Sequence, residues 1–181
     1  MITPRAVLIG PPGSGKSTVA ARLAHAWGVA ARDTDEDVVA ASGREVAAIF
    51  VDSGEDAFRA LERSAVVAAL ATHAGVLALG GGAVLDPNTQ ADLRDYAARG
   101  GAVVFLNVGL AIAARRVGLA QSRPLLAGNP RRAWALLMEE RRATYESLAT
   151  LIVKTDGVSP REIAAEISRA LGAEASTGGT R

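Results

Sequence analysis

A glycine-rich segment near the N-terminus has the residue types and spacing of a phosphate-binding loop. Residues 10–17, with the sequence GPPGSGKS, match the pattern G-x-x-x-x-G-K-[ST] at every fixed position. Glycines let backbone N–H groups turn towards phosphate oxygens, while Lys16 supplies positive charge to the β- and γ-phosphates and Ser17 offers a hydroxyl to Mg²⁺. The alternative is a glycine-rich turn with a surface lysine. The loop predicts binding of a nucleoside triphosphate with magnesium, but it does not indicate which reaction follows.

Two carboxylates lie two residues apart, at Asp33 and Asp35, after a short apolar stretch. In an extended strand such residues face the same side. One carboxylate could orient Mg²⁺ or its waters, and the other could accept a proton from a substrate hydroxyl. An acidic cap on the following helix is the alternative interpretation.

A possible anion clamp follows in a predicted helix, where Arg59 and Glu62 are three residues apart and therefore share a face. The planar guanidinium of an arginine can bind a carboxylate through two parallel hydrogen bonds. The pair therefore suits a substrate that carries a carboxylate. The alternative is a solvated ion pair on the helix surface, which contributes little to stability.

Three consecutive glycines, Gly80, Gly81 and Gly82, directly follow an apolar run. Ligands of open α/β folds bind at the carboxyl ends of the strands, and glycines there let a substrate lie against the backbone. The alternative is a flexible turn. The position at a predicted strand end favours a ligand-binding loop.

The residues around these motifs predict alternating strands and helices. Short apolar runs are typical of buried strands, and apolar spacings of three and four are typical of helices. Predicted strands are residues 6–9, 29–32, 76–79, 102–106 and 151–154. Predicted helices are residues 16–27, 38–41, 45–50, 53–71, 88–98, 110–117, 131–149 and 160–171. This alternation predicts a three-layer α/β/α fold with a central parallel sheet of about five strands.

A single domain is predicted over residues 1–171, because no linker or internal repeat divides the chain. The polar loop at 119–129 has the length at which lids occur, which places a predicted lid at about 117–130. Residues 172–181 are predicted to form a flexible C-terminal tail. Trp27 and Trp134 occupy helical positions and are predicted to pack in the core.

Composition narrows the class of protein further. The 181 residues are 49% hydrophobic, carry a formal net charge of +1 and include no cysteine. Disulfides and thiolate metal sites are therefore excluded, and the near-neutral charge gives no general attraction to nucleic acid or membrane. The short apolar run near the N-terminus predicts neither a signal peptide nor a membrane span. A cytoplasmic protein is expected.

Taken together, the motifs resemble those of the shikimate kinases, in the nucleoside-monophosphate-kinase-like group of P-loop folds. The resemblance extends from Ala6 to about Leu171, with the motifs in matching order. It rests on segments 10–17, 33–35, 54–55, 58–59, 80–82 and 122–126 (SRPLL), and on Glu62, Arg141 and Tyr145. The D-T-D, G-G-G and R-P-L-L elements are more specific than the phosphate loop alone.

The resemblance implies an ATP-dependent transfer of phosphate to the 3-hydroxyl of shikimate, giving shikimate 3-phosphate and ADP, a step in chorismate and aromatic amino-acid biosynthesis. It implies a monomer with ATP and shikimate as small-molecule partners, Mg²⁺ as cofactor, and no nucleic-acid or membrane partner. A related small-molecule kinase, acting on gluconate or a nucleotide, is the alternative enzyme. A non-catalytic nucleotide switch is less compatible with candidates for both a base and a clamp.

The resemblance also implies a role for each matching residue. Lys16, Asp35 and Arg123 would be catalytic, with Asp35 as candidate base, and Mg²⁺ would contact Ser17 directly and Asp33 through water. ATP would be bound by Gly13, Ser14, Gly15, Lys16, Ser17, Thr18, Arg116, Arg123 and Pro160. Shikimate would be bound by Asp35, Phe50, Phe58, Arg59, Glu62, Gly80, Gly81, Gly82 and Arg141.

Two choices between neighbouring arginines remain open in the sequence. The family often has the pattern R-x-P-x-Y, but Ala143 occupies the proline position here, so Arg142 competes with Arg141 as the second carboxylate clamp. Arg115 and Arg116 are equivalent in charge and geometry, and only the resemblance favours Arg116.

Overall fold

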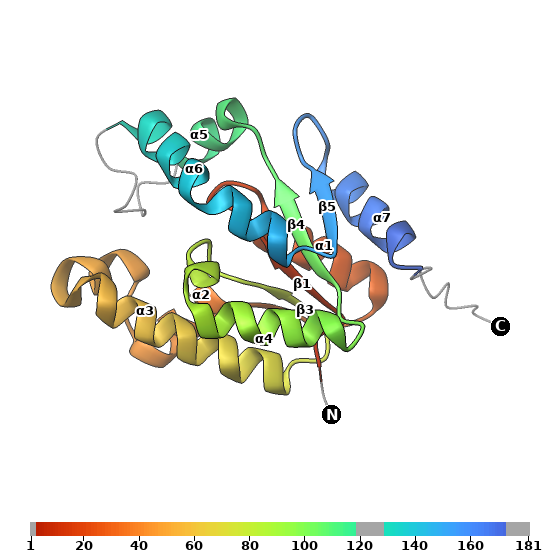
Figure 1. Cartoon of the computed structure of the whole chain (residues 1–181), viewed down its shortest axis with the longest axis horizontal. Coiled ribbons are helices and arrows are strands. Elements are labelled where there is room, and N and C mark those ends of the chain that lie inside the picture. The colour runs from red at the N-terminus through yellow and green to blue at the C-terminus, as the bar shows by residue number, and fades with distance from the viewer. Residues whose placement is uncertain (1–2, 119–128, 173–181) are drawn as a thin grey trace.

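A five-stranded parallel sheet forms the centre of the computed structural model, which describes residues 3–118 and 129–172 (Figure 1). The strand order is β2-β3-β1-β4-β5, and every pair of neighbours is parallel. The strands are β1 (Ala6–Ile9), β2 (Ala31–Asp33), β3 (Val76–Ala78), β4 (Val103–Asn107) and β5 (Leu151–Lys154). The prediction of a parallel sheet with about five strands is confirmed.

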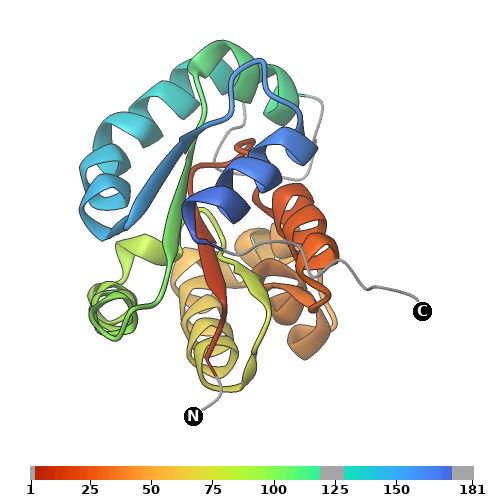
Figure 2. The ribbon, with the colours of Figure 1, turned by 90° about the vertical axis from the view of Figure 1, so that its right-hand side faces the viewer.

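Helices lie between successive strands, and one further helix follows the last strand. They are α1 (Lys16–Trp27), α2 (Thr34–Ser42), α3 (Val46–Thr72), α4 (Pro87–Ala98), α5 (Leu110–Gly118), α6 (Pro130–Leu148) and α7 (Pro160–Ala170), with the 3-10 helix η1 (Ala83–Leu85). Helices α1 and α7 cover one face of the sheet, and α4 and α6 lie on the other (Figure 2). The predicted three-layer α/β/α class is therefore confirmed. In the described part of the chain, no helix combines the length and apolarity that a membrane crossing requires.

Strand β1 shows why these short apolar runs become strands. All four of its residues are buried. Val7 and Ile9 pack into the core beneath α3, α4 and α6, whereas Ala6 and Leu8 pack against α1 and α7. Because successive side chains of a strand point to opposite faces, a continuous apolar run suits a strand covered on both sides.

The strand order places the chemical motifs at one edge of the sheet. The chain crosses from β1 to β2 and β3 on one side, and then to β4 and β5 on the other. The phosphate loop follows β1, Asp33 ends β2, and Gly80 comes shortly after β3. Since all strands are parallel, these segments meet at the carboxyl ends, beside the point where strand order reverses.

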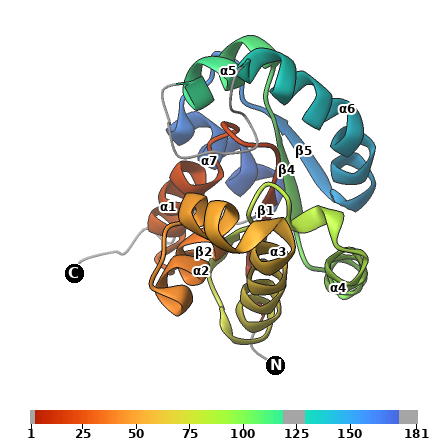
Figure 3. The same ribbon diagram turned by 90° about the vertical axis from the view of Figure 1, so that its left-hand side faces the viewer.

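Several predicted boundaries differ from the structure, and the largest difference is at α2, which begins at Thr34 rather than at residue 38. Strand β2 covers Ala31–Asp33 rather than residues 29–32, because it pairs in register with β3 and Asp33 lies opposite Ala78. The predicted helices 45–50 and 53–71 are joined in α3, but they are separated by a kink at Gly54, so the predicted break is present (Figure 3). Gly54 has φ 85° and ψ 172°, a conformation that glycine adopts without the steric cost of a Cβ atom.

Candidate active site

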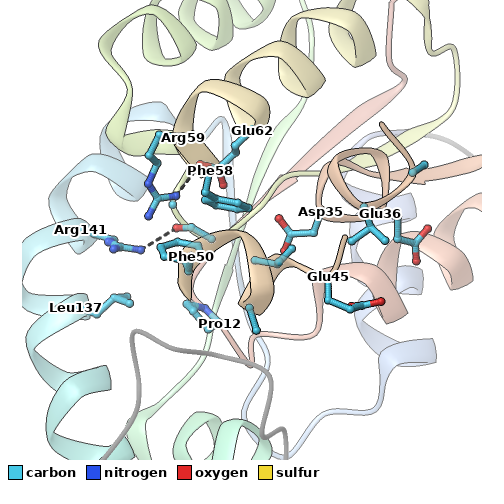
Figure 4. Close-up of a pocket in the computed structure, with 16 residues that line it drawn as sticks. Pro12, Asp35, Glu36, Glu45, Phe50, Phe58, Arg59, Glu62, Leu137 and Arg141 are labelled. Atoms are coloured by element: carbon cyan, nitrogen blue, oxygen red, sulfur yellow. Dashed lines mark hydrogen bonds and ion pairs between the residues drawn. The ribbon is translucent and has the colours of Figure 1, made fainter. Parts of the chain in front are cut away.

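A cavity of about 510 Å³ opens at the carboxyl ends of the strands (Figure 4). Its walls come from α2, α3, α6, the glycine loop at 80–82 and Pro12 of the phosphate loop. Eight of the predicted substrate-binding residues line it: Asp35, Phe50, Phe58, Arg59, Glu62, Gly81, Gly82 and Arg141. The fold thus brings together residues that lie more than a hundred positions apart in the sequence.

The phosphate loop has the backbone geometry that anion binding requires. Gly13 and Gly15 have φ of 80° and 91°, in the left-handed region that favours glycine. Helix α1 begins at Lys16 after Gly15, which has no side chain to cap the helix. The N-terminus of the helix, with the positive end of its dipole, therefore faces the loop, an arrangement that suits phosphate oxygens. Lys16 Nζ donates to the carbonyls of Gly10 (2.9 Å) and Pro11 (3.2 Å), so its ammonium group is held over the loop.

The proposed metal ligands are in direct contact. The Ser17 hydroxyl donates to Asp33 Oδ2 at 2.5 Å, while Asp33 Oδ1 accepts from the Asp35 backbone N–H at 2.9 Å. Asp33 therefore caps α2, as the alternative interpretation anticipated, and also faces the phosphate loop. A hydroxyl and a carboxylate are oxygen ligands of the kind that Mg²⁺ prefers, with phosphate and water supplying the rest. The residues present fit a magnesium ion, although the described residues contain no cluster of three or more acidic, histidine or cysteine side chains that could hold a metal unaided.

Gly80 lies beneath two carboxylates. A Cβ atom at this position would collide with Glu62 Oε1 and Asp35 Oδ1, so both carboxylates approach the backbone closely and would have to shift to admit a side chain. The Gly80 N–H donates to the Thr34 hydroxyl at 2.9 Å, and Thr34 is fully buried. Thr34 thus fixes the end of β2 to the glycine loop, a role that sequence analysis missed; its position between two aspartates was the available signal.

The Arg59–Glu62 pair joins a buried carboxylate to a half-buried guanidinium, so it is not a fully solvated surface pair. Arg59 donates to Glu62 Oε2 at 2.6 Å and to Glu55 Oε1 at 2.9 Å, and Glu62 is only 2% exposed. Burial raises the pKa of Glu62, the positive charge of Arg59 opposes that shift, and the nearby carboxylate of Asp35 adds to it. The guanidinium also lies 5.3 Å from the ring centroid of Phe58. The pair therefore presents a positioned cation at the cavity wall.

The structure distinguishes the two candidate arginines on α6 by their environment. Arg141 is 6% exposed, lines the cavity and donates from Nη1 to the Gly81 carbonyl at 3.3 Å. Its Nε has no hydrogen-bond partner among the described residues. Arg142 is exposed and contacts Glu146 (3.5 Å) and Asn107 (3.4 Å) instead. Helix α6 continues unbroken through Ala143, so the missing proline leaves Arg141 pointing into the cavity.

Among the predicted nucleotide-binding residues outside the phosphate loop, Arg116 contacts it directly. Arg116 Nη1 donates to the Gly13 carbonyl at 3.1 Å. Ser14 is 1% exposed, and its hydroxyl has no hydrogen-bond partner in the described chain. Thr18 lies in the exposed first turn of α1, and Pro160 begins α7 behind its Ser159 cap. Arg123 and the predicted lid segment from 119 to 128 lie outside the described residues.

Comparison with known proteins decides the family. The family model described as shikimate kinase matches residues 12–172. The chain belongs to the shikimate kinase family. A shikimate kinase from Streptomyces avermitilis is 53% identical over 171 residues, covering 94% of this chain and 97% of that protein. A second shikimate kinase, from Streptomyces coelicolor, is 55% identical over 163 residues, covering 90% of this chain and 92% of the relative.

Solved structures of shikimate kinases share the fold. The shikimate kinase from Acinetobacter baumannii, in complex with shikimate, superposes with a TM-score of 0.88 at 29% identity, covering 95% of this chain and 94% of that chain. The predicted family, the kinase fold and the assignment as a phosphotransferase are confirmed. The roles of individual residues within this shikimate kinase fold remain proposals, which the geometry above supports.

Proposed function

We propose that this enzyme transfers the γ-phosphoryl group of ATP to the 3-hydroxyl of shikimate, giving shikimate 3-phosphate and ADP. The observation that carries the proposal is one cavity that joins Asp35, Arg59 and Arg141 and is also lined by Pro12 of the phosphate loop. A cationic clamp and a carboxylate therefore lie beside the loop that holds the phosphate donor. Family membership favours this reaction over the alternatives, a gluconate or nucleotide kinase.

Shikimate has one carboxylate and several ring hydroxyls, and the cavity offers a partner for each kind of group. Arg59 and Arg141 bind the carboxylate, because they are the two guanidinium groups that line the cavity in the described part of the chain. Asp35 accepts a hydrogen bond from the ring hydroxyls and takes the proton as the hydroxyl attacks. Phe50 and Phe58, whose ring centroids are 4.6 Å apart, cover an apolar face of the ring.

Charge compensation for the transferred phosphoryl group comes from the phosphate loop. Lys16 and the N-terminus of α1 face the β- and γ-phosphates, and preorganised positive groups stabilise the charge that spreads over the phosphoryl oxygens. Ser17 and, through water, Asp33 would hold Mg²⁺, which would neutralise part of the phosphate charge. Arg116 lies over the loop at Gly13, and we assign Arg123 of the lid a further cationic role.

The domain, the lid and the oligomeric state of the enzyme form the second part of the proposal. We propose that residues 1–171 act as a single kinase domain with a lid at about 117–130, which excludes water and thereby suppresses hydrolysis of ATP. We also propose that the enzyme works as a monomer in the cytoplasm, on small molecules, without a nucleic-acid or membrane partner. A sequence without cysteine supports the cytoplasmic location, and the near-neutral net charge supports the absence of a nucleic-acid or membrane partner.

A coupled assay of ADP release tests the reaction. Shikimate, gluconate and nucleoside monophosphates are supplied separately as acceptors with ATP and Mg²⁺, and the product is checked for phosphate on the 3-hydroxyl. ADP release is expected with shikimate alone. Release with gluconate or a nucleotide and none with shikimate would overturn the proposed function.

A further inference from the structure

Helix α6 presents three hydrogen-bond donors on one face, at Trp134, Arg141 and Tyr145. Their separations of seven and four residues correspond to two turns and one turn, so the side chains point the same way. The Trp134 indole N–H donates to the Pro12 carbonyl at 2.9 Å, and the Tyr145 hydroxyl donates to the Gly81 carbonyl at 2.6 Å. Arg141 donates to the same Gly81 oxygen at 3.3 Å.

The acceptors of these bonds belong to the two loops that form the site. Pro12 is part of the phosphate loop, and Gly81 is the middle residue of the glycine loop. The loops touch each other, since a Cβ atom on Gly81 would lie 3.1 Å from Cδ of Pro12. One rigid helix face therefore sets the positions of both loops where they meet.

Tyr145 is the most firmly held of the three donors. Its side chain is fully buried and stacks on Phe105 of β4, with ring centroids 5.1 Å apart and an interplanar angle of 16°. Burial raises the pKa of the hydroxyl to about 12, so it remains a neutral donor at any working pH. The sheet thus fixes the ring, and the ring fixes the hydroxyl against the Gly81 carbonyl.

We infer that Tyr145 is a positioning residue for shikimate binding. Its hydroxyl holds the Gly81 carbonyl, and that oxygen in turn anchors the Arg141 guanidinium and the backbone on which the substrate ring lies. Without the hydroxyl, Arg141 is the remaining donor to the Gly81 oxygen among the described residues. The Gly81 carbonyl is then held less firmly, and so is the Arg141 guanidinium that bonds to it. The inference deepens the proposed function and rests on it.

The test compares Tyr145→Phe with Tyr96→Phe. Each substitution keeps the ring and removes a buried hydroxyl that bonds the backbone; the Tyr96 hydroxyl donates to Pro4 (2.9 Å) and accepts from the Ala102 N–H (3.2 Å), away from the cavity. For Tyr145→Phe, KM for shikimate is expected to rise about 3–10-fold, the effect of one neutral hydrogen bond, with KM for ATP changed less than about twofold. Tyr96→Phe is expected to lower Tm and leave both KM values unchanged.

Two outcomes would overturn the inference. Tyr145→Phe could lower Tm and keep the wild-type KM for shikimate, which would make the hydroxyl merely structural. Both variants could instead raise that KM equally, which would point to general destabilisation. If Tyr145→Phe does not fold, Trp134→Phe tests the same helix face, and an unchanged KM for both substrates would count against it. Wild-type activity with shikimate is measured first, because its absence would refute the proposed function and not the positioning role.

Discussion

The carboxylate of Glu62 lies 2.6 Å from the guanidinium of Arg59 in a position where Glu62 is only 2% exposed. Such a pair differs from a surface ion pair, because the carboxylate has been removed from water while the half-buried guanidinium still reaches solvent. Desolvation of Glu62 outweighs its attraction to Arg59, so the pKa of the carboxyl is raised above 4.5. The pair therefore makes the stability of the protein depend on pH.

Glu62→Gln should expose this dependence in denaturant unfolding measured between about pH 4 and pH 7. A raised pKa in the folded state gives stabilisation that is fully present below about pH 4.5 and is lost as pH rises through the folded pKa. The free energy of unfolding of the wild type should therefore fall relative to that of the non-titrating glutamine variant as pH increases.

Glu162→Gln is the control of opposite sign. Hydrogen bonds from the Ser159 side chain and backbone lower the pKa of Glu162. Its stabilisation is therefore present above about pH 4.5 and lost as pH falls through the folded pKa. Relative to this variant, the wild type should lose stability on acidification. The difference in unfolding free energy between wild type and variant should change with pH in opposite directions for the two variants. A change in the same direction would contradict the pKa shifts of Glu62 and Glu162.

The two neighbouring arginines of α6 give a second prediction. Arg141→Ala should raise KM for shikimate about 10–100-fold, since a hydrogen bond between charged groups contributes about 1.5–3 kcal/mol. Arg142→Ala should change KM less than about twofold, because Arg142 is exposed and bonds Glu146 and Asn107. Steady-state kinetics of both variants with shikimate check this. Equal increases in KM for shikimate in the two variants would show that Arg141 is not the preferred carboxylate ligand.

A third prediction concerns the glycine beneath the carboxylates. Gly80→Ala should displace Glu62 and Asp35, because its Cβ atom would overlap both, and kcat/KM for shikimate should fall at least about tenfold. Gly100→Ala is the comparison: Gly100 has φ 87° and its Cβ atom would meet nothing within 4 Å among the described residues. That variant should lose about 1–2 kcal/mol of stability through backbone strain alone. Normal shikimate kinetics for Gly80→Ala would refute the placement of the carboxylates.

The contact between Ser17 and Asp33 gives the fourth prediction. Asp33→Asn should raise the Mg²⁺ concentration needed for half-maximal activity, because the carboxylate that faces Ser17 Oγ is replaced by a neutral amide. KM for shikimate at saturating Mg²⁺ should stay near the wild-type value. A magnesium titration of ADP release measures the first effect. An unchanged titration curve would remove Asp33 from the metal site.

Local patterns in the sequence predicted the sheet, the phosphate loop and most helices, because each depends on periodicity or on a fixed motif. Strand β1 and its loop are examples, since buried apolar runs and glycine spacing act over a few residues. The break near Gly54 was also predicted, whereas the limits of β2 were less predictable, because register with β3 decides them. Long-range hydrogen bonds to backbone carbonyls, such as those that Gly81 accepts from α6, were not predicted.

Two residues show why the candidate site could be predicted only in part. The spacing of Glu62 from Arg59 fits a solvated pair as well as a buried one, and only the packing around Gly80 distinguishes them. Trp134 was predicted to pack in the core, and it is 2% exposed, but its bond to Pro12 was not foreseen. Every residue has a backbone carbonyl, so the sequence does not indicate which carbonyl accepts a hydrogen bond. Such contacts can be identified only from the structure.

The bond between Trp134 and Pro12 also places a fluorescent side chain against the phosphate loop. The chain has two tryptophans, and the second, Trp27, belongs to the core on the opposite face, where its indole N–H donates to Ser168 at 2.9 Å. A change in indole emission when a nucleotide occupies the phosphate loop should therefore arise from Trp134, with Trp27 as an internal reference. Titration with ADP, compared between the native chain and Trp134→Phe, would follow nucleotide binding without any added dye.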